Sequence, residues 1–191
     1  MPTTDTIPEV FAADRAGWRA WLAANGETVA KVWLVYYKVA TGTPSVSYAE
    51  AVEEALCYGW IDSRVSPVDD TRYKQIFTPR KPGSVWSKVN KARVASLLQS
   101  NQITPVGLRI IEAAQRDGSW NALDAVEDLL YPDDFLAALR DAPPAQENFS
   151  RFSDSAKKYA LRKILTAKRG DTRRKWIETI TTLAVQNRQI V

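Results

Sequence analysis

Two stretches of alternating residues, separated by a short turn, indicate a β-hairpin near the middle of the chain. WIDSRV (60–65) and TRYKQIFT (71–78) follow the two-residue period of a β-strand, and SPVDD (66–70) between them is typical of a turn. The segment KVWLVYYKV (31–39) is rich in β-branched and aromatic residues, which is typical of a buried strand. Together the segments predict a small antiparallel sheet.

Most of the remaining sequence is typical of helices, because apolar residues recur at helical spacing between recognisable capping residues. The expected helices cover 13–24, 47–59, 84–99, 104–118, a short acidic segment from 132, 153–169 and a last segment around 176–184. Gly170 is expected to separate the last two helices, which then form a hairpin. We therefore predict an α+β fold, predominantly helical, with a small antiparallel sheet of about three strands and a C-terminal helical hairpin.

The length of 191 residues suits one domain with an appendage, and 45% hydrophobic residues suffice for a buried core. DAPPAQE (141–147) is the best candidate for a linker. We predict an α+β core domain over residues 1–140. A linker and a basic helical hairpin follow over 141–191, and the hairpin is expected to dock on the same core.

The chain contains no histidine and one cysteine, which restricts its chemistry. Ser-His-Asp and Cys-His catalysis and imidazole metal sites are excluded, and one cysteine cannot build a thiolate zinc site. Neither G-x-G-x-x-G nor a P-loop motif is present. We therefore predict no metal and no cofactor. Cys57 is expected to be a buried, unreactive thiol.

Charges are unevenly distributed, although the net charge is only +4. Residues 71–93 carry seven cationic side chains and no carboxylate, and residues 151–175 carry ten cationic and two acidic side chains. Residues 120–150, in contrast, carry seven acidic side chains and one arginine. The interpretation that we favour is that the basic C-terminal helix presents a face that is solvated or pairs with this acidic block. The alternative is a surface for anionic lipid or phosphates.

The predicted hairpin brings Asp62 and Arg80 to the same end of the sheet, because antiparallel pairing places the start of one strand beside the end of its partner. One interpretation is an ion pair that holds the loop after Arg80. The other is a ligand site in which Arg80 binds an anion through two parallel hydrogen bonds. If the protein is an enzyme, Asp62 is the candidate general base and Arg80 the electrostatic stabiliser; otherwise we predict no catalytic residue.

The segment that follows Arg80 is the second candidate. A Gly-Ser step before a helix can direct backbone N–H groups and hydroxyls toward one point, where an anion binds at the positive end of the helix dipole. Alternatively, the serines only cap the helix and the lysines face water. Tryptophans beside these cations offer stacking surfaces, although tryptophan more often belongs to a core. The predicted ligand-binding residues are Trp60, Asp62, Arg80, Lys81, Ser84, Trp86, Ser87, Lys88 and Asn90.

Four segments that carry these motifs resemble a single family. They are EEALCYGWIDSRV (53–65), FTPRKPGSVWSKVNK (77–91), ITPVGLRIIEAAQRDGSW (103–120) and SAKKYALRKILTAKRGDTRRKWIE (155–178). In this order they resemble the YdeI/OmpD-associated family, also called bacteriocin-protection proteins. Family members commonly have Met before Thr-Pro-x-Gly, where this chain has Ile103. The resemblance implies protection against bacteriocins or antimicrobial peptides and association with an outer-membrane porin, and it implies no catalytic residue, cofactor or substrate.

We predict a non-enzymatic bacterial stress-related protein that binds an anionic ligand or a protein partner at residues 80–91. The alternatives are an enzyme for a small phosphorylated or carboxylated substrate and a nucleic-acid-binding module, which the net charge of +4 disfavours. The longest apolar run, VWLVYY (32–37), is too short to span a bilayer, and the N-terminal sequence shows no secretory signal. The expected location is therefore the cytoplasm. The sequence predicts no oligomeric state.

Overall fold

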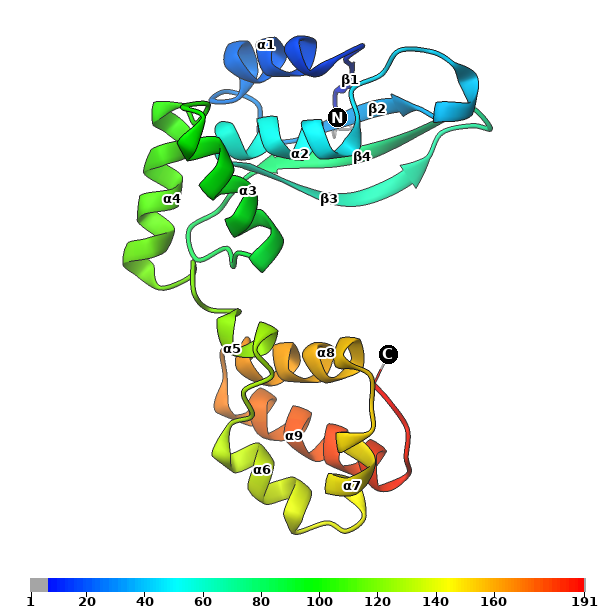
Figure 1. The fold of residues 1–191 in the computed structure, drawn as a ribbon, viewed down its shortest axis with the longest axis vertical. Coiled ribbons are helices and arrows are strands. Elements are labelled where there is room, and N and C mark those ends of the chain that lie inside the picture. Colours follow the sequence, from blue (N-terminus) through cyan, green and yellow to red (C-terminus); the bar gives the residue numbers. More distant parts are fainter. Residues whose placement is uncertain (1–6, 191) are drawn as a thin grey trace, which may run out of the picture. The chain divides into compact units, whose positions relative to one another are not determined.

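The computed structural model describes residues 7–190 and contains two compact units, the first ending at Trp120 and the second beginning at Asn121 (Figure 1). The first unit combines a four-stranded sheet with helices, and the described residues of the second form helices and turns. The predicted α+β fold with a small sheet and C-terminal helices is therefore confirmed.

The sheet has the strand order β1-β2-β4-β3. Its strands are β1 (Glu9–Phe11), β2 (Val32–Tyr37), β3 (Trp60–Pro67) and β4 (Arg72–Pro79). Strands β3 and β4 form the predicted hairpin, and β2 pairs with β4 as the third antiparallel strand.

Strand β1 was not predicted, and it makes the sheet mixed because it runs parallel to β2. Three residues are too few to show a two-residue period, so the sequence carries no strand signal there. The strand forms because β2 offers it a partner, and the N–H of Trp33 donates to the carbonyl of Pro8 at 2.8 Å.

Helices of the first unit begin at residues whose side chains cap them. They are α1 (Arg15–Asn25), the short 3-10 helix η1 (Val39–Thr41), α2 (Tyr48–Cys57), α3 (Lys88–Gln99) and α4 (Pro105–Asp117). Asp14, Ser47, Ser87 and Thr104 each accept a hydrogen bond from a backbone N–H of the first turn. Ser47 and Glu50 complete the predicted capping box.

The core of the first unit lies between the sheet and helices α1 and α2, which share one side of it (Figure 1). Leu34 and Tyr36 of β2 point into this core, as does Phe77 of β4. The ring of Phe77 contacts that of Trp18 on α1, with centroids 5.3 Å apart. This packing fixes the ends of β3 and β4, where the candidate residues lie.

The start of α4 packs tightly onto the end of α2. The carbonyl of Cys57 accepts hydrogen bonds from the N–H and the hydroxyl of Thr104, at 3.1 and 2.7 Å. The thiol of Cys57 is buried, as predicted. Burial, followed by the nearby charge of Glu54, raises its pKa to about 11, so the reactive thiolate is disfavoured.

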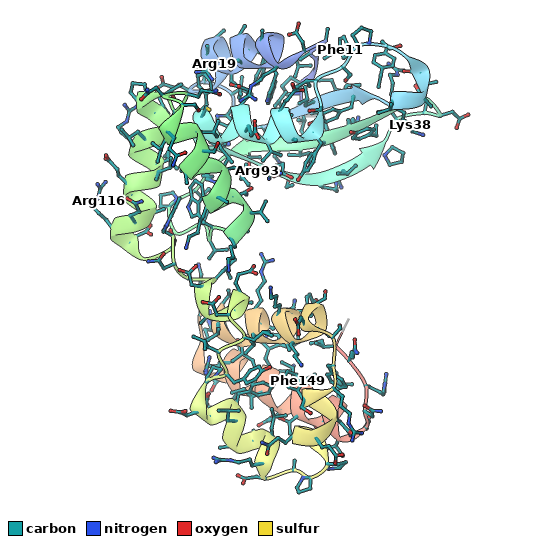
Figure 2. The ribbon with its side chains drawn as sticks, viewed as in Figure 1. Phe11, Arg19, Lys38, Arg93, Arg116 and Phe149 are labelled. Carbon is teal, nitrogen blue, oxygen red and sulfur yellow. The ribbon has the colours of Figure 1, made fainter. Side chains whose placement is uncertain are left out.

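The second unit is built around a cluster of aromatic rings. Its helices are α5 (Asp124–Glu127), α6 (Asp133–Arg140), α7 (Ala145–Ser150), α8 (Asp154–Leu165) and α9 (Gly170–Val185). Phe149 lies inside this unit (Figure 2), and its ring contacts those of Tyr131, Phe135 and Phe152 at centroid distances of 5.2 to 5.8 Å. None of the described helices has the length and apolar composition needed to cross a bilayer.

Three boundaries of the second unit differ from the prediction. Helix α8 ends at Leu165, because the hydroxyl of Thr166 and the guanidinium of Arg173 satisfy carbonyls of its last turn. Gly170 is the first residue of α9 and not the end of α8. The expected linker 141–147 contains the start of α7, and α6 packs against α7 and α9, so the boundary between units lies at 120/121 and not at 140/141.

Ion pairs connect the acidic block to the basic helices within the second unit. Lys158 on α8 pairs with Glu127 at 2.9 Å, and Arg173 on α9 pairs with Asp134 at 2.8 Å. The hydrogen bond from Arg173 also holds the pKa of Asp134 below its ordinary value. The favoured pairing of acidic and basic blocks is thus confirmed for these two pairs.

Candidate functional site

Arg80 is held at the point where the sheet ends and the following loop begins. Its N–H donates to the carbonyl of Gly59 at 2.9 Å, directly before β3. Gly59 has a φ of 72°, a conformation that glycine adopts without steric cost. The Arg80 side chain therefore starts from a fixed backbone and turns inward, where it is only 6% exposed.

The guanidinium of Arg80 is buried, and no carboxylate of the described residues pairs with it. Its central carbon lies 3.5 Å from the ring centroid of Trp86, and one terminal nitrogen donates to the carbonyl of Val85 at 3.3 Å. Its Nε atom has no partner among the described residues. Burial lowers the pKa of Arg80 to about 10, an effect that the charge of Asp62 partly opposes. The group is still cationic at neutral pH, and burial of a charge without a counter-ion is unfavourable in free energy.

A cavity of about 40 Å³ lies beside this guanidinium, between the loop and the end of α4. Ser119 closes it on the α4 side, is 7% exposed and has a hydroxyl without a partner among the described residues. The lining residues are Arg80, Lys81, Pro82, Gly83, Ser84 and Trp86 from the loop, and Ile110, Ala113, Ala114, Asp117 and Ser119 from α4 and its end.

Asp117 ties the two walls of the cavity together. One of its oxygens accepts from the N–H of Ser119 at 2.9 Å, and the other accepts from the N–H of Gly83 at 3.2 Å. The nearby Ser119 side chain, followed by the N–H groups of Ser119 and Gly83, lowers the pKa of the Asp117 carboxyl. Its two oxygens are therefore occupied by the backbone, and Asp117 does not neutralise Arg80.

The cavity suits a small oxyanion or the oxyanion group of a larger molecule. Arg80 and Ser119 both line it, and the Nε–H of Arg80 and the hydroxyl of Ser119 have no acceptor among the described residues. A single water needs a cavity of only about 10–15 Å³, so there is room for a group larger than one water. Hydrogen bonds from a guanidinium to an oxyanion are among the strongest in proteins.

Four of the predicted ligand-binding residues line this cavity, namely Arg80, Lys81, Ser84 and Trp86. The cradle of backbone amides is not formed, because the N–H of Gly83 donates to Asp117 and that of Ser84 to the carbonyl of Lys81. That these four side chains contact a ligand stays a prediction.

The other predicted residues have roles in the fold. Ser87 caps α3 by accepting from the N–H of Asn90 at 3.2 Å, and the side chain of Asn90 accepts from Arg93 at 3.0 Å. Lys88 is exposed in the first turn of α3. Trp60 is a core residue whose indole N–H donates to the carbonyl of Gly26 at 3.0 Å.

The expected ion pair between Asp62 and Arg80 is not formed. Asp62 accepts hydrogen bonds from the amide of Gln75 at 2.7 Å and from the hydroxyl of Tyr48 at 3.1 Å. The hairpin does bring both residues to one end of the sheet, but Arg80 turns toward Trp86 while Asp62 lies under the start of α2. Pairing register fixes backbone positions and leaves side-chain direction open.

Sequence reasoning missed Ser119 and Asp117, which complete the cavity. Both belong to the motif RDGSW (116–120), which spans the end of α4. Gly118 has a φ of 80° and reverses the chain, so the two residues on either side of it face the loop after β4. The signal in the sequence that could have identified them is a polar residue on each side of the glycine that ends the helix.

Comparison with family models assigns both units. Residues 10–110 match the model of a domain of unknown function, DUF8412, and residues 128–187 match the model described as Bacteriocin-protection, YdeI or OmpD-Associated. Comparisons with curated proteins and with solved structures each gave no match. The motifs GWID and FTPR fall within the first match, which covers more than half of the chain. The chain therefore belongs to the DUF8412 family, and its helical unit belongs to the YdeI/OmpD-associated family.

Proposed function

We propose that this protein is a non-enzymatic binding protein that holds an oxyanion group in the cavity beside Arg80. The ligand accepts hydrogen bonds from Arg80 and Ser119 and lies against the ring of Trp86. Binding of this ligand is the step that links the chain to the protection against bacteriocins named in the description of its C-terminal family.

The observation that carries the proposal is the buried guanidinium of Arg80, to whose Nε–H the described residues offer no acceptor. Buried charges in proteins are normally paired, because the loss of hydration costs several kcal/mol for each ion. Contact with the face of Trp86 offsets only part of this cost. An oxyanion in the cavity supplies the missing acceptor for both Arg80 and Ser119. If Arg80 served only to hold the loop, we would expect a carboxylate of the protein to pair with it.

The test is an oxyanion titration followed by thermal unfolding. We expect sulfate, phosphate or acetate to raise the midpoint temperature of the wild-type protein more than chloride does at equal ionic strength. An oxyanion at one hundred times its dissociation constant stabilises by about 2.7 kcal/mol. The extra rise should disappear in Arg80→Met and shrink in Ser119→Ala.

The matched control is Arg109→Met, which removes the same charge from an exposed position on α4. Sulfate and phosphate stabilise many proteins without binding to a site, and such an effect acts equally on every variant. An equal rise in wild type, Arg80→Met and Arg109→Met would therefore contradict the proposal. The comparison uses the shift caused by the anion, so a change in the stability of the variant itself does not obscure it.

A further inference from the structure

A second group of buried polar side chains without partners lies at the start of α2. Tyr36 on β2 is 1% exposed, and its hydroxyl has no partner among the described residues. Gln75 on the neighbouring strand β4 is 3% exposed, and its Oε1 atom also lacks a partner there. Buried polar atoms are nearly always satisfied, so two on adjacent strands point to a group that binds between them.

Asp62 joins these side chains on their solvent side. Its Oδ2 atom accepts from Gln75 and Tyr48, while Oδ1 accepts no hydrogen bond from the described residues. The charge of Asp62 also reaches Tyr36. There it adds to burial and to the effect of Tyr73 in raising the pKa of the hydroxyl, so Tyr36 stays neutral.

The atoms left open define the chemistry of the ligand. A carboxylate oxygen and an amide oxygen can only accept hydrogen bonds, and a tyrosine hydroxyl can accept as well as donate. An oxyanion is unsuitable, because it would meet the charge of Asp62 and the carbonyl dipole of Gln75. A primary ammonium has three donors, no acceptor and the complementary charge.

Aromatic faces and neighbouring charges set the expected strength. The rings of Tyr36 and Tyr73 are stacked with centroids 4.8 Å apart, and ring faces attract cations. Two neighbouring cations oppose the binding of an ammonium group. Arg80 interacts with Asp62, and Arg93 on α3 interacts with Tyr48. We therefore expect affinity in the millimolar range, about −4 kcal/mol on the standard conversion.

We propose that Tyr36, Tyr48, Asp62 and Gln75 form a binding site for a primary ammonium group, entered when the side chain of Tyr48 turns outward. Tyr48 is 45% exposed, and its hydroxyl bonds only to Asp62 among the described residues, so this rotation breaks one hydrogen bond. The ammonium then donates to Asp62, Gln75 and Tyr36. The site shares no residue with the cavity beside Arg80, so it does not depend on the function proposed above.

The experiment is an NMR titration that follows the side-chain amide of Gln75 in the full chain. The probes are n-butylammonium, for a free amine, and Nα-acetyl-lysine amide, for a lysine side chain; 1-butanol is the neutral control. Saturable shifts with either cation and none with butanol support the site, and the cation that binds more tightly identifies the source. Absence of saturation with both cations, or equal shifts with butanol, overturns it.

Two variants assign the binding to these residues. Asp62→Asn should weaken binding at least about tenfold, the loss expected for a hydrogen bond to a charged group. Because this change also weakens the contacts to Tyr48 and Gln75, Tyr36→Phe serves as a second variant that removes only the partnerless hydroxyl. It should bind several-fold more weakly while its thermal midpoint stays equal or rises.

A different result is expected if a buried water, and not an ammonium group, bonds to Tyr36 and Gln75. If Tyr36→Phe binds n-butylammonium as tightly as wild type, and a crystal structure shows one water bridging the two side chains, the ammonium site is overturned. Ser119→Ala is the control for independence and should leave ammonium binding unchanged. A loss of the oxyanion effect in Ser119→Ala with ammonium binding intact separates the two proposals.

Discussion

Glu54 on α2 shows how one buried carboxylate organises the surface between α1 and α2. It is 1% exposed, and its two oxygens pair with Arg15 and Arg19 on α1. Burial lowers the pKa values of the two arginines. The hydrogen bonds and the charge of Glu54 together raise them by more, so both pKa values lie above the ordinary one. The pairs therefore favour the charged state of both arginines.

We predict that Glu54→Gln lowers the free energy of unfolding by about 1–3 kcal/mol, because two hydrogen bonds between charged groups become weaker ones. Both arginines are about one-third exposed and can turn toward water. The loss of stability is therefore smaller than when a fully buried charge loses its partner. The control is Glu53→Gln, whose side chain is 30% exposed and, among the described residues, pairs only with Arg15. It should cost less than about 1 kcal/mol. Equal midpoints for the two variants in urea unfolding would contradict this account.

At the scale of elements, the motif Thr-Pro-x-Gly (104–107) joins α4 to α2. Thr104 caps α4 and bonds to the carbonyl of Cys57, and Pro105 occupies the first turn. At Gly107, a β-carbon would lie 2.2 Å from the carbonyl oxygen of Cys57. The glycine is therefore needed for close approach of two helices and not for an unusual backbone angle.

We predict that Gly107→Ala destabilises the first unit by about 3 kcal/mol, because backbone atoms cannot move aside as a side chain can. The matched control is Gly17→Ala on α1, where the nearest atom to a β-carbon lies at 3.5 Å, an ordinary contact. That change should stabilise by about 0.4–1 kcal/mol through the unfolded chain. Urea unfolding of both variants, followed by tryptophan fluorescence, tests the pair, and a neutral Gly107→Ala would disprove the close approach.

The same scale shows what the sequence could predict. Caps at Ser47, Ser87, Thr104 and Ser153 were identifiable because capping depends on residues three positions apart. Strand β1 was not, because its pairing with β2 depends on a partner more than twenty residues away. The same limit applies to the site. Register located Arg80 correctly at the sheet end, but its turn toward Trp86 depends on packing with α4, which no local pattern records.

At the scale of the molecule, each unit has its own buried residues, and each family match falls inside one unit. We predict that residues 1–120 and 121–191 fold when produced separately. The sum of their far-UV circular dichroism spectra should equal the spectrum of the whole chain. The second fragment is small for an independent domain, so its stability should be marginal. A fragment 121–191 without cooperative thermal unfolding would show that the division is only geometric.

The position of Ser119 and Asp117 has a consequence for how such proteins are assembled from modules. The first family match ends at residue 110, whereas the far wall of the cavity comes from residues 110–119. A protein that carried only the matched segment would keep Arg80 and lose the hydroxyl and the carboxylate that complete its surroundings. The cavity thus depends on residues that follow the family match, and replacement of the chain after the edge of the match would remove one wall of the cavity without touching the sheet.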